Sequence, residues 1–257
     1  GVMAGLATQA QHVIDTLVRN LYERTADVGF LATDSMLCRY VAGLADGVGV
    51  QERLRAYRSK YTVYNEILLV GLDGTVLAQT DGDSPVEGSQ DPLLAQTLHS
   101  SGYVETFRAT QLRPGKRHAL IYSHRMLDPR TSEPVGVLCL SFAFEGEMQG
   151  IFHSRANEDK RSIQLLLDGG NRVIASGDPL WIPVGAQVPV NPLGAPDLLV
   201  HGGRTYLVQT VAAAGYQVML GQSGYENSRE DALLEALTNG QLFAAGLDVF
   251  RKEPDFD

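Results

Sequence analysis

The side chains best suited to binding a small molecule gather in and beside one predicted strand, residues 117–127. Alternation along a strand places residues two apart on one face, so His118, Tyr122 and His124 are predicted to share a side, with Arg108 on the neighbouring strand. Arg offers a planar fork to a carboxylate and His a switchable charge, so such a group would bind a small anion. The alternative is that these side chains cover an exposed sheet face or satisfy polar groups in the core. The expected ligand-binding residues are Arg108, Arg117, Tyr122 and His124.

No pattern for catalysis or metal binding stands out. The six His residues show no ligand spacing, since His118 and His124 are too far apart on one strand to share an ion. Asp73 and Asp168 stand at or just before predicted turns, where Asp is a common turn former. No segment resembles the strained turn that carries a nucleophilic Ser. We therefore expect no catalytic residue, no metal and no cofactor.

Composition limits the classes of protein further. With 44% hydrophobic and 20% charged residues, the 257-residue chain is globular and long enough for one large domain or two small ones. A formal net charge of −9 argues against nucleic-acid binding, which relies on Lys and Arg. Cys38 and Cys139 could form a bridge, but two buried free thiols are favoured. No apolar run is long enough to cross a bilayer, so the chain is expected to be soluble, although it could be a piece of a membrane protein.

One hairpin pattern occurs twice. In residues 66–81 an apolar run, an Asp-Gly turn and a second β-prone run predict a hairpin, because Gly accepts the positive φ of a tight turn. The same order returns in residues 162–178 at an offset of about 97 residues, which aligns Leu69 with Leu166 and Ala78 with Ala175. The chain is therefore predicted to contain two related modules in tandem.

The remaining elements follow from periodicity, caps and turn residues. Apolar residues at spacings of three and four predict a long amphipathic helix over about 2–31. Pro residues between about 179 and 196 predict a loop in the second module where the first has a helix. The other predicted helices are 36–41, 50–60, a short one from 92 and 145–154, and the other predicted strands are 103–111, 117–127, 134–144, 204–211 and 216–222.

This order of elements, with residues 20–28, 67–81 and 134–142, resembles the double Cache sensor domain. That domain is the extracytoplasmic ligand-binding region of many bacterial chemoreceptors, histidine kinases and cyclic-di-nucleotide enzymes. The resemblance covers about Met3 to Tyr225. It implies a ligand held between the sheet and the loops of the first module, and a signal that leaves through the long helix and the end of the second module. The amine-binding pattern, Arg followed by Trp-Tyr after the second strand, is replaced by residues 91–95, so the resemblance does not extend to an amino-acid ligand.

Residues 230–254 resemble a different family, the NAD-dependent D-2-hydroxyacid dehydrogenases. In those enzymes the segment is a helix, a turn and a strand, and the Glu that matches Glu253 hydrogen-bonds the catalytic His. The chain has no G-x-G-x-x-G and no His after this Glu, so the resemblance implies no NAD site and no acid–base chemistry. A fusion, an assembly artefact, or a helix and strand that cover the second module are the alternatives.

The sequence thus predicts an α+β fold in which a long N-terminal helix precedes two tandem PAS-like antiparallel sheet modules. The expected divisions are 1–60 for the helical entry, 61–155 for the membrane-distal module, 156–228 for the membrane-proximal module and 229–257 for a dehydrogenase-like tail.

The expected function is that of a non-enzymatic sensor domain, binding a small anionic metabolite in its first module. The parent protein would be a membrane-anchored signalling receptor, a chemoreceptor or a two-component kinase, with this part in the periplasm. A cytoplasmic location stays open, and a homodimer along the N-terminal helix is one option. The alternatives are a protein related to NAD-dependent 2-hydroxyacid dehydrogenases, and a structural domain with an empty pocket.

Overall fold

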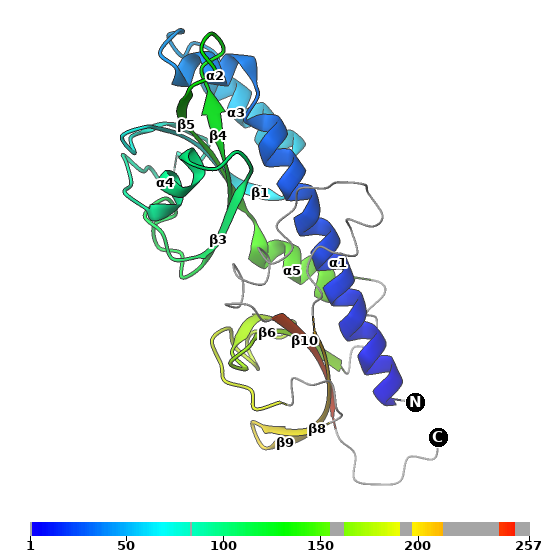
Figure 1. The fold of residues 1–257 in the computed structure, drawn as a ribbon. Coiled ribbons are helices and arrows are strands. Elements are labelled where there is room, and N and C mark those ends of the chain that lie inside the picture. The colour runs from blue at the N-terminus through cyan, green and yellow to red at the C-terminus, as the bar shows by residue number, and fades with distance from the viewer. Residues whose placement is uncertain (1, 83, 155–161, 191–196, 213–241, 250–257) are drawn as a thin grey trace. The chain divides into compact units, whose positions relative to one another are not determined.

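The computed structural model describes residues 2–82, 84–154, 162–190, 197–212 and 242–249. The described residues form two compact units, each built on a five-stranded antiparallel sheet. Of the described residues, one unit comprises Tyr22–Phe144, and the other contains those up to Leu21 and those from Glu145 onward. The α+β class and the two tandem sheet modules predicted from the sequence are therefore confirmed (Figure 1).

The three N-terminal helices have the predicted positions. Helix α1 (Val2–Leu31) buries the apolar stripe that predicted it, with Leu17, Leu21 and Val28 fully inaccessible. Asp34 caps the next helix, because its carboxylate accepts a hydrogen bond from the Leu37 backbone N–H at 3.0 Å. The helices that follow α1 are α2 (Ser35–Val41) and α3 (Val50–Lys60).

The first sheet has the strand order β2-β1-β5-β4-β3. The hairpin at its edge turns at Gly74, whose φ of 86° is the positive value that the Asp-Gly pattern predicted. One face of the sheet presents Leu68, Ile121 and Cys139 to an apolar core that also contains Leu93. The strands are β1 (Tyr64–Gly71), β2 (Val76–Gln79), β3 (Val104–Arg108), β4 (Ala119–Leu127) and β5 (Pro134–Phe142).

Helix α4 (Pro92–Leu98) covers that face of the first sheet (Figure 1). Pro92 fits the first helical position, where no backbone N–H is needed, and the Asp91 side chain accepts from the Leu93 N–H at 2.9 Å. A buried hydrogen bond of 2.8 Å joins the hydroxyls of Thr97 on the helix and Ser123 on β4. Helix α4 is therefore fixed to this side of the sheet by both apolar and polar contacts.

The second sheet repeats the plan of the first, with the order β7-β6-β10-β9-β8. The repeat shows in the register of the hairpins: pairing shifts between Leu69 and Val70 in one and between Leu166 and Leu167 in the other. These are the residues that the offset of about 97 aligns. The elements are α5 (Phe144–Phe152), β6 (Ser162–Asp168), β7 (Val173–Ser176), β8 (Asp197–His201), β9 (Arg204–Ala212) and β10 (Leu242–Val249).

The last strand, β10, lies in the middle of the second sheet, where it is antiparallel to both β6 and β9. The prediction counted residues 229–257 as a separate tail, and for residues 242–249 this is wrong. Phe243, Ala245 and Leu247 face the core of the unit, whereas a Cβ on Gly246 would lie only 3.2 Å from the Leu6 carbonyl oxygen of α1. Phe243 and Leu247 fill the core on one face, and Gly246 allows the close approach of α1 on the other, so the segment fits this position.

One further difference, and one prediction that the described residues do not cover, concern the same unit. Strand β8 was not predicted, because the preceding Pro residues favoured a loop throughout. The strand predicted over 216–222 lies outside the described residues.

Cys38 and Cys139 are both free and buried, as favoured from the sequence. No helix in the described residues is long and apolar enough to span a membrane.

Candidate functional site

A buried carboxylate stands on the first sheet, at the end of the face that α4 covers. Glu66 of β1 is fully inaccessible to solvent and shares its face with Leu68 and Val70 of the apolar core. In the second module the aligned residue is Ile163, which packs against that module's core. The hairpin fold therefore does not require a carboxylate here, and a buried acid at such a position indicates a specific role.

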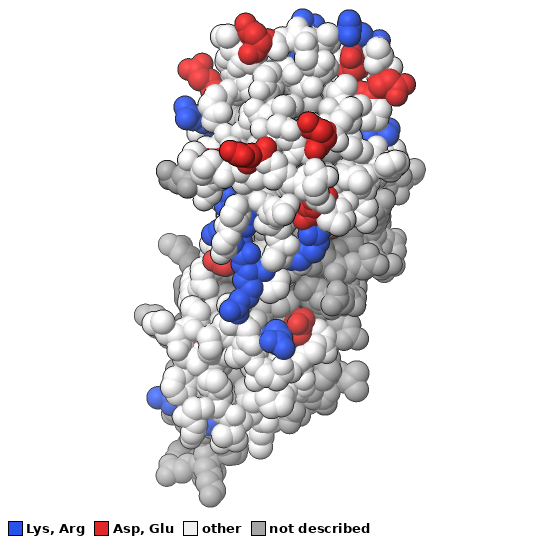
Figure 2. Space-filling view, turned by 90° about the vertical axis from the view of Figure 1, so that its left-hand side faces the viewer, with Lys and Arg blue, Asp and Glu red and all other residues white. Residues whose placement is uncertain are grey.

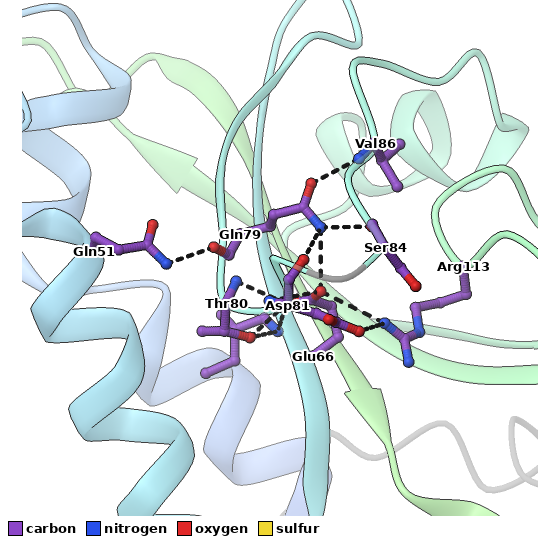
Figure 3. Close-up of polar contacts among 9 residues, drawn as sticks. Gln51, Glu66, Gln79, Thr80, Asp81, Ser84, Val86 and Arg113 are labelled. Atoms are coloured by element: carbon purple, nitrogen blue, oxygen red, sulfur yellow. Dashed lines mark hydrogen bonds and ion pairs between the residues drawn. The ribbon is translucent and has the colours of Figure 1, made fainter.

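The Glu66 carboxylate is held by donors of its own hairpin (Figure 3). Its Oε1 accepts from the backbone N–H groups of Ile67 and Thr80, each at 2.8 Å, and from the Thr80 hydroxyl. The backbone N–H of Asp81 lies 3.0 Å from both carboxylate oxygens. These bonds satisfy most of the acceptor capacity of Glu66 and fix it between β1 and the end of β2.

Gln79 belongs to the same cluster of polar side chains around Glu66 and lies on its hairpin side (Figure 3). Its Nε2 donates to Glu66 Oε2 at 3.2 Å and to the Ser84 carbonyl at 3.0 Å, and its Oε1 accepts from the Val86 N–H at 2.8 Å. Its own carbonyl accepts from Gln51 of α3 at 2.8 Å. Gln79 thus joins Glu66 to the chain after β2 through its side chain, and to helix α3 through its backbone carbonyl.

Arg113, in the segment between β3 and β4, brings the only cation of the cluster drawn in Figure 3. Its side chain is 7% exposed, and its Nη1 lies 3.5 Å from Glu66 Oε2 and 3.4 Å from Asp81 Oδ2. Both distances are long for charge-assisted hydrogen bonds, which are usually about 2.7–2.9 Å. The buried Nε has no hydrogen-bond partner among the described residues. Arg113 is therefore a buried guanidinium with unused donor capacity.

The four residues predicted to bind a ligand do not line one pocket. Tyr122 and His124 share a face of β4, as predicted, and the His124 ring lies 3.9 Å from the position that a Cβ on Gly29 of α1 would occupy. Arg108 pairs with Ala119 and so faces the opposite side, toward the core beneath α4. Tyr122 is fully buried. Arg117 is exposed in the segment that also contains Arg113.

Arg108 forms an ion pair with a carboxylate of the chain itself, that of Asp91. It forms a two-pronged ion pair with Asp91, with Nη1 at 2.6 Å from Oδ2, and the Thr110 hydroxyl donates to the same oxygen at 2.6 Å. Burial raises the pKa of Asp91, but the bonds from Arg108, Thr110 and the Leu93 N–H outweigh it, so the net pKa is lowered. This pair holds the start of α4 against β3.

Another polar feature lies at the turn of the first hairpin. A shallow depression of about 270 Å³ opens there. The groups around it are hydrogen-bonded to one another, since Gln111 Oε1 accepts from Ser89 at 3.2 Å and Gln90 donates to the Asp73 carbonyl at 3.1 Å. No group of three or more His, Cys, Asp or Glu side chains in the described parts of the chain could hold a metal ion. The lining residues are Asp73, Gly74, Thr75, Gly88, Ser89, Gln90 and Gln111.

Sequence reasoning missed both Glu66 and Arg113 as site residues. Glu66 begins the predicted hairpin, and Arg113 falls between the predicted strands 103–111 and 117–127. The available signal was an acidic residue directly before the run Ile67–Val70, at a position where the repeat has Ile163.

No protein-family model matches the chain, and no curated protein matches it in sequence. Its structure is similar to the sensor domain of the V. cholerae histidine kinase DctB, with a TM-score of 0.67 and 12% identity over 98% of this chain and 98% of that one. The chain therefore has the fold of a bacterial sensor domain, as the double Cache resemblance implied.

Two chemoreceptor domains show the same likeness. The ligand-binding domain of P. fluorescens CtaA, solved with L-serine, has a TM-score of 0.62 and 10% identity over 96% of this chain and 97% of that one. The ligand-binding domain of the P. aeruginosa PAO1 amino-acid chemoreceptor PctC, solved with GABA, has a TM-score of 0.62 and 12% identity over 96% and 100%. The dehydrogenase resemblance of residues 230–254 receives no support from these comparisons.

Proposed function

We propose that this chain is the ligand-binding sensor domain of a bacterial transmembrane signalling receptor, and that its first module binds a small anionic metabolite through Arg113. The observation that carries the proposal is the buried guanidinium of Arg113, whose Nε has no partner among the described residues. The fold supports it, because the similar domains of CtaA and PctC were solved with small molecules that carry a carboxylate.

The Nε side of Arg113 suits a carboxylate, because the buried Nε has no hydrogen-bond partner among the described residues. Nε and Nη2 of a guanidinium can donate two parallel hydrogen bonds to the two oxygens of one carboxylate, and both ion pairs of Arg113 use Nη1 instead. Glu66 is already satisfied by its hairpin, so it meets Arg113 only at 3.5 Å. A ligand carboxylate at the Nε edge would supply the short contacts that the fold leaves unmade.

Nε is shielded from solvent, so a ligand reaches it only by displacing the groups packed around it. Such binding changes the position of Arg113 relative to Glu66 and Asp81. This is the differential contact that a sensor needs, because a ligand shifts a conformational equilibrium only by its difference in affinity for the two states.

The fold also supports the remaining parts of the proposal. The parent receptor is membrane-anchored and presents this domain outside the cytoplasm, and its catalytic or signalling output lies in other domains. A homodimer along α1 and direct ligand contacts by Arg108, Arg117, Tyr122 and His124 stay predictions.

The test is a thermal-shift screen of the whole chain against organic acids, amino acids and amines. A ligand at about 100 times its Kd stabilises the folded state by about 2.7 kcal/mol, which raises Tm by several degrees. Arg113→Gln is expected to abolish the shift, whereas the matched change Arg55→Gln, at an exposed position of α3, leaves it unchanged. No response to any carboxylate, or a full response in Arg113→Gln, would contradict the proposal.

A further inference from the structure

Strand β1 contains a β-bulge next to the candidate site. Tyr64 pairs with Phe142 and Glu66 pairs with Ser141, so two steps along β1 match one step along β5. Asn65 is the extra residue. In a regular strand Tyr64 and Glu66 would share a face, but the bulge turns them to opposite faces of the sheet.

On the face opposite Glu66, Tyr64 contacts helix α1. Its hydroxyl donates to Asp27 Oδ2 at 2.7 Å, and Arg24 Nε lies 3.1 Å from the same oxygen. The Arg24 guanidinium also lies over the Tyr64 ring, 5.5 Å from its centre. Burial raises the pKa of Tyr64, so the hydroxyl stays protonated and remains a donor. Tyr64 is thus a buried polar link between β1 and the helix.

The described part of strand β6 in the second module has no such bulge. Its β6 pairs with β10 in continuous register from Ser162 to Asp168, and Ile163 stands at the position of Glu66. The bulge has a cost, because the Asn65 Oδ1 is buried without a hydrogen-bond partner among the described residues. Both the bulge and the buried acid therefore belong to the module that carries Arg113, and the fold itself does not require them.

We propose that the bulge at Asn65 couples the Arg113 site to helix α1. Movement of Arg113 changes its contact with Glu66. The resulting displacement of Glu66 is transmitted through the bulge to Tyr64, and the Tyr64–Asp27 hydrogen bond transmits it to α1. The ligand-driven part of this inference rests on the proposed function. The coupling itself is a property of the folded chain and exists without any ligand.

A double-mutant cycle tests the coupling directly, because interacting residues give non-additive effects. Glu66→Gln perturbs the site and Tyr64→Phe removes only the hydroxyl that reaches α1. We expect the urea midpoint of the double variant to fall by clearly less than the sum of the two single shifts. The matched control pair is Glu66→Gln with Tyr57→Phe, which removes a hydroxyl bonded to Asp34 in the same unit. That pair should be additive within error.

A second variant and a second measurement keep the coupling testable if Glu66→Gln folds poorly. Arg113→Lys replaces it in the same cycle, and hydrogen exchange of the α1 amides near Asp27 should be faster in that variant than in wild type. Additive midpoints in the Tyr64 cycle with unchanged exchange in α1 would overturn the coupling. That result would leave carboxylate binding at Arg113 intact, whereas a coupled cycle in a protein that binds no carboxylate would overturn the proposed function alone.

Discussion

Replacing Glu66 by Gln should destabilise the first unit strongly, although the two side chains have the same shape. The amide oxygen can keep the role of Oε1, which accepts from Ile67 and Thr80. The amide nitrogen then replaces Oε2 and faces three donors, the Asp81 N–H, Gln79 Nε2 and Arg113 Nη1, formerly at 3.0, 3.2 and 3.5 Å. Hydrogen bonds to a charged group contribute about 1.5–3 kcal/mol, and buried donors without acceptors cost a similar amount, so we expect a loss of about 2.5 kcal/mol.

The assay is urea unfolding followed by circular dichroism and by hydrogen exchange of the first unit's amides. A loss of about 2.5 kcal/mol corresponds to a fall in Tm of about 5–10 °C for a domain of this size. The matched control is Glu133→Gln, an exposed position where surface changes usually stay within about 0.5 kcal/mol. A loss below about 0.5 kcal/mol in Glu66→Gln would refute the buried acceptor role of this carboxylate.

Three further predictions follow from the fold. Asp91→Ala should cost about 1 kcal/mol more than Asp91→Asn, because Asn keeps the N-cap of α4 while both lose the Arg108 pair; equal urea midpoints would contradict this. Burial raises the pKa of Asp34, but its hydrogen bonds to Arg53, Tyr57 and the Leu37 N–H lower the pKa more. The ionised Asp34 therefore stabilises the folded state above the unfolded pKa of about 3.9, and this stabilisation is lost as pH falls through the lower folded pKa. Acid unfolding of Asp34→Asn should accordingly show less loss of stability below pH ~4 than wild type, and identical pH profiles would disprove the assignment. Ala245→Glu would place a charge in the core of the second unit and should lower the free energy of unfolding by about 3 kcal/mol or more. Backbone amides of β6 and β9 should exchange hydrogen faster, and those of the first sheet should not. Unchanged exchange in β6 would mean that β10 is not the central strand.

The local rules of the sequence predicted most of the fold. The Asp34 and Asp91 caps and the Asp-Gly turn before Thr75 depend only on residues a few positions apart, so the local sequence alone predicts them. The hairpin repeat was equally visible, because aligned residues such as Leu69 and Leu166 have the same apolar alternation. These features need no knowledge of distant partners.

The features that were missed depend on pairing between distant segments. Strand β10 was assigned to a dehydrogenase-like tail, since nothing local shows that its small residues fit under α1. Arg108 and Tyr122 were placed together because alternation gives faces within one strand but not the register between strands, and that register sets them on opposite sides. The bulge at Asn65, which turns Glu66 away from Tyr64, has no sequence signature of its own.

The central claim is that the Nε edge of Arg113 receives the carboxylate of a ligand, and the Nε–Hε resonance of this residue reports on it directly. The signal can be assigned in a ¹H–¹⁵N spectrum by its loss in Arg113→Lys. Titration with the best carboxylate from the thermal-shift screen should move this resonance in a saturable way, with the same Kd as the stabilisation. An unchanged Arg113 resonance in a protein that the carboxylate demonstrably saturates would contradict the account.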